Sequence, residues 1–243
     1  MKRYYYDLHL HSCLSPCGDD DMTPANIAGM ASLNGLQIIA ITDHNTTRNA
    51  PALMRACEKH GIIIIPGMEI TTAEDIHLVA LFSSIQEARS FEETLAPYRI
   101  HYKNPVEIYG HQYVMDENDE VMEEEEFLLS NALLLPLEEV VALVRRIGGV
   151  VYPAHIDREA NGIIAILGTI PEDLCFTTVE IHDIDKVTVL KEKFHLEGVN
   201  VVISSDAHFL WDIQDAVNYF EFDEALTPDE IRLEIISQLG KKR

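Results

Sequence analysis

The sequence predicts an α/β protein in which short buried strands alternate with helices. Three observations support this fold class: short, fully apolar runs recur along the chain, helix start and stop signals separate them, and no polar linker divides the chain. Because strands buried on both faces are continuously apolar, we expect a mostly parallel sheet with helices on its outer face. The 243 residues fit one domain over 1–243.

Capping residues mark the ends of the expected helices. Thr23 and Pro24 supply an N-cap and a proline in the first turn, and Thr227 and Pro228 repeat this pair. Gly61 ends another helix before a β-branched run. The expected helices cover residues 23–33, 49–60, 84–98, 137–147 and 227–239, and the expected strands cover residues 4–8, 36–41, 62–65, 78–82, 150–152, 179–181 and 201–203.

Residues 104–130 interrupt this alternation. They predict a hairpin with strands at 112–115 and 120–122 across a polar turn, followed by the acidic run Glu123–Glu126. We interpret the segment as a solvated surface excursion. A lid over an active-site mouth and an acidic metal-binding patch are the alternatives.

Composition and charge argue against several classes of protein. The formal charge of −23 has the wrong sign for tracking a phosphate backbone, so we expect no nucleic-acid partner unless metal ions supply positive charge. No apolar stretch approaches membrane-spanning length, and none follows Met1 as a signal peptide requires. The four cysteines are too sparse for a disulfide scaffold, so we expect a cytoplasmic protein with reduced thiols. Oligomeric state has no signature in the sequence.

Residue types that bind metals stand at the ends of the apolar runs. They are His9, His11, Asp43, His44, Glu69, His77, His155, Asp206 and His208. His9 and His11 are two residues apart in an extended segment, so both project from one face. A buried carboxylate such as that of Glu69 is costly unless a cation neutralises it. Because strand ends on one side of a sheet or barrel converge, the series predicts a site for more than one metal ion.

The order of these motifs resembles the PHP (polymerase and histidinol phosphatase) superfamily of metal-dependent phosphoesterases. The matching strings are Asp7–Ser12, Thr42–His44, Gly67–Ile70, Ala154–His155 and Ser205–His208, which span most of the chain. The resemblance implies a distorted (β/α)7 TIM-like barrel that holds up to three metal ions at the carboxyl ends of its strands.

The resemblance also implies a set of ligands for each ion. The first ion would take His9, His11, Glu69 and Asp206, the second would share Glu69 and take His77 and His155, and the third would take His44, His208 and one residue of the loop after His11. Counting back from Thr23 favours Asp19 as that loop ligand, with Asp20 as the alternative. Cys13 and Cys17 are less favoured, because two cysteines without a second pair are a weak zinc signal.

Such a site predicts phosphate-ester hydrolysis. Two close divalent ions lower the pKa of a bridging water and offset the charge that develops during in-line attack. Zinc, manganese and iron all suit mixed imidazole and carboxylate ligands. Catalytic roles are expected for Glu69, Asp206 and His208, and for Asp43 either as a ligand or as the partner of a neighbouring imidazole. No residue is assigned as proton donor to the leaving group.

Two further residues are candidates for substrate binding. Arg158 could grip phosphate with its guanidinium group, or pair with Asp157 or Glu159 at the surface. His182 stands at a strand end and could contact substrate or lie in the core. The expected function is hydrolysis of a small-molecule phosphate ester, a nucleotide or a sugar phosphate. An oligonucleotide-trimming exonuclease and a non-catalytic metal-binding regulatory module are the alternatives.

Overall fold

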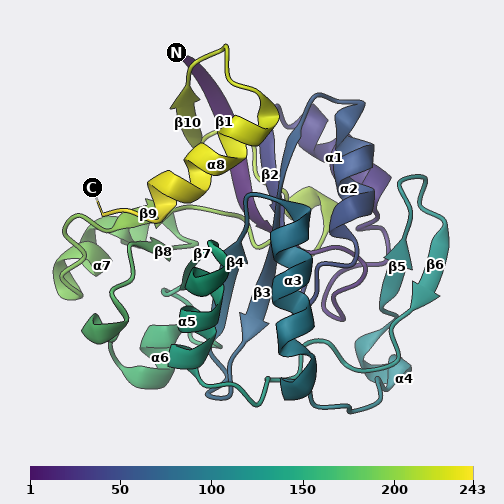
Figure 1. The fold of residues 1–243 in the computed structure, drawn as a ribbon, viewed down its shortest axis with the longest axis horizontal. Helices are drawn as coiled ribbons and strands as arrows, with labels where there is room; N and C mark the ends of the chain where they lie inside the picture. Colours follow the sequence, from purple (N-terminus) through teal and green to yellow (C-terminus); the bar gives the residue numbers. More distant parts are fainter. Residues whose placement is uncertain (243) are drawn as a thin grey trace.

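The computed structural model describes residues 1–242. Its main sheet is curled and has the strand order β10-β1-β2-β3-β4-β7 (Figure 1). The strands of this sheet are β1 (Lys2–Leu10), β2 (Ile38–Ile41), β3 (Ile63–Thr71), β4 (His77–Leu81), β7 (Val150–Pro153) and β10 (Tyr219–Phe222). A separate parallel pair contains β8 (Thr178–Glu180) and β9 (Asn200–Val202).

Backbone hydrogen bonds join the two sheets into a distorted TIM-like barrel. The N–H of Ile156, just after β7, donates to the carbonyl of Glu180 in β8 at 2.9 Å. Across the other seam, Leu10 of β1 forms a parallel bridge with Ala207, and His11 N–H donates to the Ala207 carbonyl at 3.0 Å. The wall therefore runs β1-β2-β3-β4-β7-β8-β9 and returns to β1, which confirms the predicted fold class.

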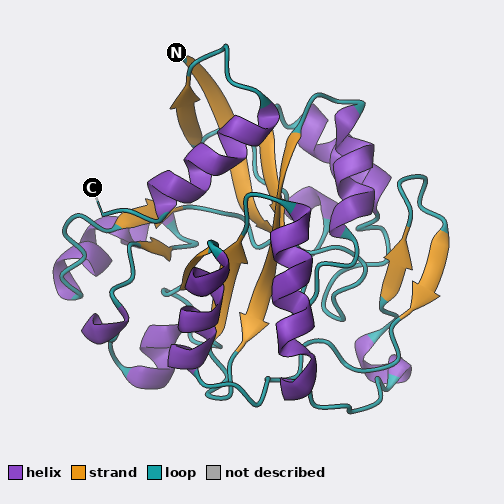
Figure 2. Ribbon diagram, viewed as in Figure 1, coloured by secondary structure: helices purple, strands orange, loops and turns teal. Residues whose placement is uncertain are grey.

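Helices cover the outside of the barrel (Figure 2). The longer ones are α1 (Pro24–Leu33), α2 (Ala50–Glu58), α3 (Ile85–Leu95), α5 (Leu137–Ile147) and α8 (Pro228–Leu239), close to the predicted ranges. The short helices α4 (Val106–Tyr109), α6 (Ile163–Leu167) and α7 (Val187–Lys193) carried too little periodic pattern to be predicted. Among the helices of residues 1–242, none has the length and apolar character needed to cross a bilayer.

The main sheet contains more antiparallel pairs than expected. Strands β1, β2 and β3 are parallel, but β4 runs antiparallel to both β3 and β7. The connection over residues 72–76 is too short for a crossover, so β4 must reverse direction. The reversal places His77, at the start of β4, beside the carboxyl end of β3. His155 follows β7, which runs in the same direction as β3, and so lies at the same edge.

Apolar side chains fill the barrel interior and close one of its ends. Leu8, Ile65 and Tyr152 belong to one buried cluster with side chains from the other wall strands. Ile231 and Ile235 of α8 join this cluster, together with residues of β10. The amino-terminal end is therefore sealed by packing, and the opposite end stays open.

A bulge in β1 directs the first histidine toward that open end. Asp7 pairs with Ile39 and Leu10 with Ile41, so β1 carries one extra residue between these two pairs. Leu8 belongs to the interior cluster, whereas Leu10 belongs to the outer cluster beneath α1 and α2. An extra residue lets two consecutive side chains face the same side. His9 therefore follows Leu8 inward and reaches side chains across the barrel.

The predicted hairpin is present as β5 (Tyr113–Met115) and β6 (Val121–Glu124), which are antiparallel. It is held against the barrel, because Tyr113 N–H donates to the Cys13 carbonyl at 3.1 Å. Arg48 pairs with Glu125 at 2.9 Å and also with Glu123. This arginine engages the acidic run, and no residue of the run joins the potential metal groups found within residues 1–242.

Gly67→Ala is expected to destabilise the protein by about 1–3 kcal/mol, because overpacking a closed site forces the backbone to shift. A Cβ at Gly67 would lie 2.7 Å from the Ala80 carbonyl oxygen and 2.7 Å from Leu81 Cδ2. Urea unfolding measures the change. Gly29→Ala in α1 is the control, since its Cβ meets nothing within 4 Å and alanine favours a helix. Equal effects of the two substitutions would contradict the close approach of β3 and β4.

Candidate metal centre

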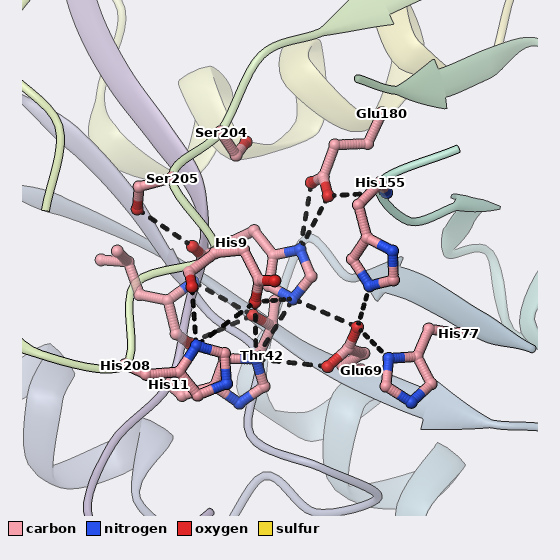
Figure 3. Close-up of polar contacts among 12 residues, drawn as sticks. His9, His11, Thr42, Glu69, His77, His155, Glu180, Ser204, Ser205 and His208 are labelled. Atoms are coloured by element: carbon pink, nitrogen blue, oxygen red, sulfur yellow. Dashed lines mark hydrogen bonds and ion pairs between the residues drawn. The ribbon is translucent and has the colours of Figure 1, made fainter. Parts of the chain in front are cut away.

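Eight of the nine predicted metal ligands gather at the open end of the barrel (Figure 3). They form three groups in which the potential ligand atoms lie within 4.8 Å of one another. The groups are His9, His11, Glu69 and Asp206, then Glu69, His77 and His155, and finally His11, Cys17, His44 and His208. Glu69 and His11 each belong to two groups, so the three share one connected cluster.

The first group is almost completely buried. Nε2 of His9 and Nε2 of His11 lie 3.2 Å apart, and each lies 3.2 Å from Oδ1 of Asp206. Oε2 of Glu69 lies 3.2 Å from Nε2 of His11. Nitrogen lone pairs and carboxylate oxygens therefore converge on one point, where they repel one another unless a proton or a metal cation intervenes. This donor set fits a divalent cation.

The second group uses the other oxygen of Glu69. Oε1 lies 2.8 Å from Nδ1 of His77 and 3.2 Å from Nε2 of His155. His155 has φ 28° and Asp206 has φ 53°, a left-handed conformation that is costly for residues other than glycine. A strained backbone persists where the surrounding structure holds it. Here the strained conformations accompany the placement of the His155 and Asp206 side chains in the cluster.

The third group contains Cys17 in place of the expected aspartate. Gly18 N–H donates to the Ser15 carbonyl at 2.8 Å, a tight turn that brings the Cys17 thiol toward His11. Asp19 is directed elsewhere, since its carboxylate accepts the Asp21 N–H at 2.9 Å. Neither Asp19 nor the alternative Asp20 joins a ligand group within residues 1–242. A single thiol can complete a site with imidazoles, so Cys17 becomes a candidate ligand by its position, and the identity of the loop ligand stays a prediction.

Glu180 supports the cluster and was not singled out by the sequence. Its carboxylate oxygens lie 2.9 and 3.1 Å from Nδ1 of His9, and Oε1 accepts the backbone N–H of His155 at 3.0 Å. The contact fixes the His9 ring and leaves Nε2 facing Glu69 and Asp206. A glutamate between Val179 and Ile181 in an apolar strand was the available signal, because a buried charge requires a partner.

Asp43 lies behind the ligands and not among them. Its carboxylate accepts the Ser12 N–H and hydroxyl, both at 2.7 Å, and the Ser15 hydroxyl at 2.8 Å. Ser15 Oγ in turn lies 2.9 Å from Nδ1 of His11. Asp43 is 1% exposed and reaches the His11 ring through Ser15. This contact fits the expected role as the partner of a neighbouring imidazole, and the catalytic role stays a prediction.

Burial and neighbouring charges have opposite effects on the pKa values of the cluster. Burial opposes protonation of His9 and His11, but the surrounding carboxylates prevail and raise both pKa values, that of His11 to about 9. Burial raises the pKa of the Glu69 and Asp206 carboxyls, yet the adjacent histidines lower both overall. The two protonated imidazoles and the two carboxylates therefore stabilise one another as opposite charges. A metal ion bound among them would supply the same positive charge.

The other two histidines of the third group favour their neutral forms. Burial lowers the pKa of His44 well below its ordinary value. Burial and the nearby His11 lower the pKa of His208 to about 4. Neutral imidazoles carry the lone pairs that metals require. The Cys17 residue is exposed overall, but burial around its thiol and the Glu69 and Asp206 carboxylates raise its pKa well above the ordinary value.

Both predicted substrate residues stand beside the cluster. The Arg158 guanidinium donates to Oδ2 of Asp206, and its other terminal nitrogen lies 3.4 Å from Nδ1 of His182. Arg158 therefore pairs with Asp206 and not with Asp157 or Glu159. Arg158 and His182 line a cavity of about 620 Å³ with Asp206 and His208. A volume of this size accommodates a small organic ligand.

Residues 7–162 match the PHP domain family. The chain belongs to the PHP domain family. This confirms the membership that the motif series predicted. The fold, with its barrel closed at one end and a ligand cluster at the other, is consistent with that membership.

Three curated proteins are similar to part of this sequence. An uncharacterized protein of Methanocaldococcus jannaschii is 33% identical over 99 residues, which cover 37% of this chain and 57% of that protein. The 5′-3′ exoribonuclease Rnm of Salmonella typhimurium is 37% identical over 81 residues, 31% of this chain and 27% of the enzyme. A 5′-3′ exoribonuclease of Haemophilus influenzae is 34% identical over 79 residues, 31% of this chain and 28% of the enzyme. The chain thus spans only part of the curated relatives it matches.

Solved structures share the fold at low sequence identity. The lesion-specific endonuclease EndoQ of Pyrococcus furiosus superposes with TM-score 0.65 and 20% identity, covering 99% of this chain and 57% of EndoQ. A Bifidobacterium adolescentis protein assigned as a metal-dependent phosphoesterase superposes with TM-score 0.60 and 20% identity, covering 97% of this chain and 96% of that protein.

The relatives overturn the expectation that nucleic acid is no partner for a chain of this kind. Two of the PHP relatives are exoribonucleases, and an Endonuclease Q structure contains a 27-mer duplex with an abasic lesion at the active site. The net charge of −23 was a poor criterion, because metal ions bound at a site reverse the charge that a phosphate meets there. Total charge does not describe the potential at the open end of the barrel.

Glu180→Gln is expected to weaken metal binding about 10- to 100-fold, because one amide oxygen cannot replace two carboxylate oxygens that orient His9 and the backbone of His155. Titration of the metal-free protein with zinc in competition with a chelator measures the affinity. Glu192→Gln, at an exposed position of α7, is the matched control. Unchanged zinc affinity in Glu180→Gln would show that the contact does not orient the ligands.

Filling all three groups with metal at pH 7.5 is expected to release about three protons, because His9, His11 and the Cys17 thiol are protonated in the metal-free protein. His44 and His208 contribute none, since both are already neutral. Metal affinity should therefore rise with pH through the His11 pKa of about 9, and the Cys17 thiol extends the rise at the third group. Calorimetry in buffers of different ionisation enthalpy counts the protons. A binding enthalpy independent of buffer would contradict this protonation.

Proposed function

We propose that this PHP domain is a metal-dependent phosphoesterase whose open barrel end binds and hydrolyses a phosphate ester. The main support for the proposal is that two ligand groups share Glu69. Its Oε2 lies near His11, and its Oε1 lies near His77 and His155. A structural metal site usually closes its coordination with four protein ligands. Shared ligands beside an open cavity instead suit a site that leaves positions for water and substrate.

We assign the ligands by the three groups described above. His9, His11, Glu69 and Asp206 would hold one ion, Glu69, His77 and His155 a second, and His44, His208 and Cys17 a third. Oδ1 of Asp206 lies 3.2 Å from Nε2 of both His9 and His11, and Nδ1 of His44 lies 3.3 Å from Oε2 of Glu69, so potential donor atoms crowd together as the ligands of a cation do. Imidazole and carboxylate donors suit zinc, manganese and iron, and a thiolate in the third group adds preference for the softer of these ions.

The protein side chains would orient the reacting groups. When bound, the divalent ions would supply Lewis acidity at the phosphate and an acidified water as nucleophile. Glu180 and Ser15 hold the His9 and His11 rings so that Nε2 faces inward. Arg158, already at the cavity wall, would donate two hydrogen bonds to phosphate oxygens. No side-chain nucleophile is needed, and a proton donor for the leaving group is not assigned.

The substrate we propose first is a small phosphate ester, a nucleotide or a sugar phosphate. The cavity of about 620 Å³ matches one such molecule. The exoribonuclease relatives favour a second candidate, trimming of single-stranded nucleic acid from one end. Both candidate substrates place one phosphate at the metal groups. They differ in the rest of the substrate, which is one small molecule in the first case and a nucleic-acid strand in the second.

Hydrolysis assays distinguish these candidates from each other and from a non-catalytic module. Protein loaded with zinc, manganese or iron is given adenosine 5′-monophosphate, ribose 5-phosphate or a single-stranded oligonucleotide. We expect phosphate release from at least one monophosphate. A higher kcat/KM for the oligonucleotide would favour the trimming enzyme. Loss of turnover on every substrate, with the full metal content verified, would favour the regulatory module.

Glu69→Gln is expected to abolish turnover and to remove at least one bound ion, because an amide cannot bridge two cations with two charged oxygens. Elemental analysis of the purified variant, together with phosphate-release assays, measures both effects. Glu58→Gln is the control, since Glu58 is exposed at the end of α2. Full metal content in Glu69→Gln would contradict the proposed bridging role.

A further inference from the structure

Two aromatic side chains stand exposed directly after the last ligand of the cluster. Phe209 follows His208, and Trp211 lies in the short 3-10 turn Leu210–Asp212. Their rings are stacked, with centroids 4.9 Å apart and planes inclined by 14°. Trp211 is 75% exposed and Phe209 is 36% exposed. Two large rings that stack on each other while facing solvent indicate a surface built for contact.

The intervening residue fixes this aromatic pair in place. Leu210 packs against the buried cluster beneath α1 and α2, whereas neither Phe209 nor Trp211 belongs to a buried cluster of residues 1–242. Asp212 N–H donates to the Phe209 carbonyl at 3.0 Å and closes the turn. The backbone is thus anchored on one side, and the rings are held outward without serving the core.

The pair adjoins a cavity that is lined by some of the proposed metal ligands. Phe209 lines the cavity of about 620 Å³ together with Asp206, His208 and Arg158. Asp212 lines the same cavity and is exposed, so its carboxylate can accept hydrogen bonds from a ligand. A molecule with its phosphate at Arg158 and the ligand cluster would therefore extend past Phe209.

We propose that Phe209 and Trp211 form a stacking platform for a nucleobase of the substrate, a proposal that rests on the phosphoesterase function. A nucleobase is planar and extends a two-ring stack, and aromatic platforms bind the bases of single-stranded nucleic acids in this way. Asp212 would accept a base amino group or a ribose hydroxyl. The platform selects a nucleotide, free or at the end of a strand, over a phosphate ester that carries only a sugar.

The chain contains a single tryptophan, so Trp211 fluorescence reports on the platform directly. Adenosine 5′-monophosphate is expected to quench this fluorescence in the full-length protein, and ribose 5-phosphate is expected to leave it unchanged. This binding measurement does not depend on turnover. Equal responses to the two compounds, or no response to either, would overturn the platform.

Kinetics test the same claim separately from the phosphoesterase proposal. Trp211→Ala is expected to lower kcat/KM for adenosine 5′-monophosphate or a short single-stranded oligonucleotide about 5- to 100-fold, mainly through KM. Ribose 5-phosphate, if hydrolysed, should be unaffected, and Trp211→Phe should retain most of the nucleotide activity. Tyr109→Ala, at an exposed aromatic of α4, is the control.

The outcomes separate the two proposals. Wild-type protein that hydrolyses no ester contradicts the phosphoesterase function, and fluorescence quenching then decides on the platform alone. Active protein in which Trp211→Ala leaves nucleotide hydrolysis unchanged contradicts the platform. If Trp211→Ala alters only the oligomeric state in sedimentation, the aromatic pair is a protein contact and the nucleobase proposal is wrong.

Discussion

The burial of Glu69 among histidines is the constraint on which the rest of this structure depends. Its carboxylate is 1% exposed, and its oxygens lie within 3.4 Å of ring nitrogens from His9, His11, His44, His77 and His155. A carboxylate held this deep requires positive charge, from protonated imidazole or from metal ions. In the metal-free state the raised pKa values of His9 and His11 supply that charge, and bound cations would replace those protons.

The fold meets this constraint by directing strands and turns to one edge. Antiparallel β4 brings its first residue, His77, to the carboxyl end of β3, and the bulge in β1 turns His9 inward. The opposite end is sealed by apolar side chains of α8 and β10, and the potential metal ligands meet at the open end. Glu180 and Asp43 then hold the rings of His9 and His11 from behind, the latter through Ser15.

Much of this arrangement could be predicted from the sequence, because each ligand type stood at the end of an apolar run. The pairs His9 with His11 and Asp206 with His208 are local features that the sequence shows, but their directions also depend on the bulge in β1 and on the left-handed backbone of Asp206. The third group was harder to predict. Cys17 reaches it through a turn closed by Gly18, and residue spacing gives no sign of that turn. The antiparallel β4 was missed because apolar runs carry no sign of direction, and Glu180 because its partner lies in a distant strand.

Diffraction from metal-loaded crystals, recorded on both sides of the metal absorption edge, tests whether metal ions meet the charge of Glu69. We expect anomalous peaks at the open end of the barrel, one between His9, His11 and Asp206 and another beside His77 and His155, with Glu69 between the two. A peak beside Cys17, His44 and His208 would place the third ion. Bound metal located elsewhere, with Glu69 paired only to protonated histidines in the loaded protein, would show that this cluster is not a metal centre.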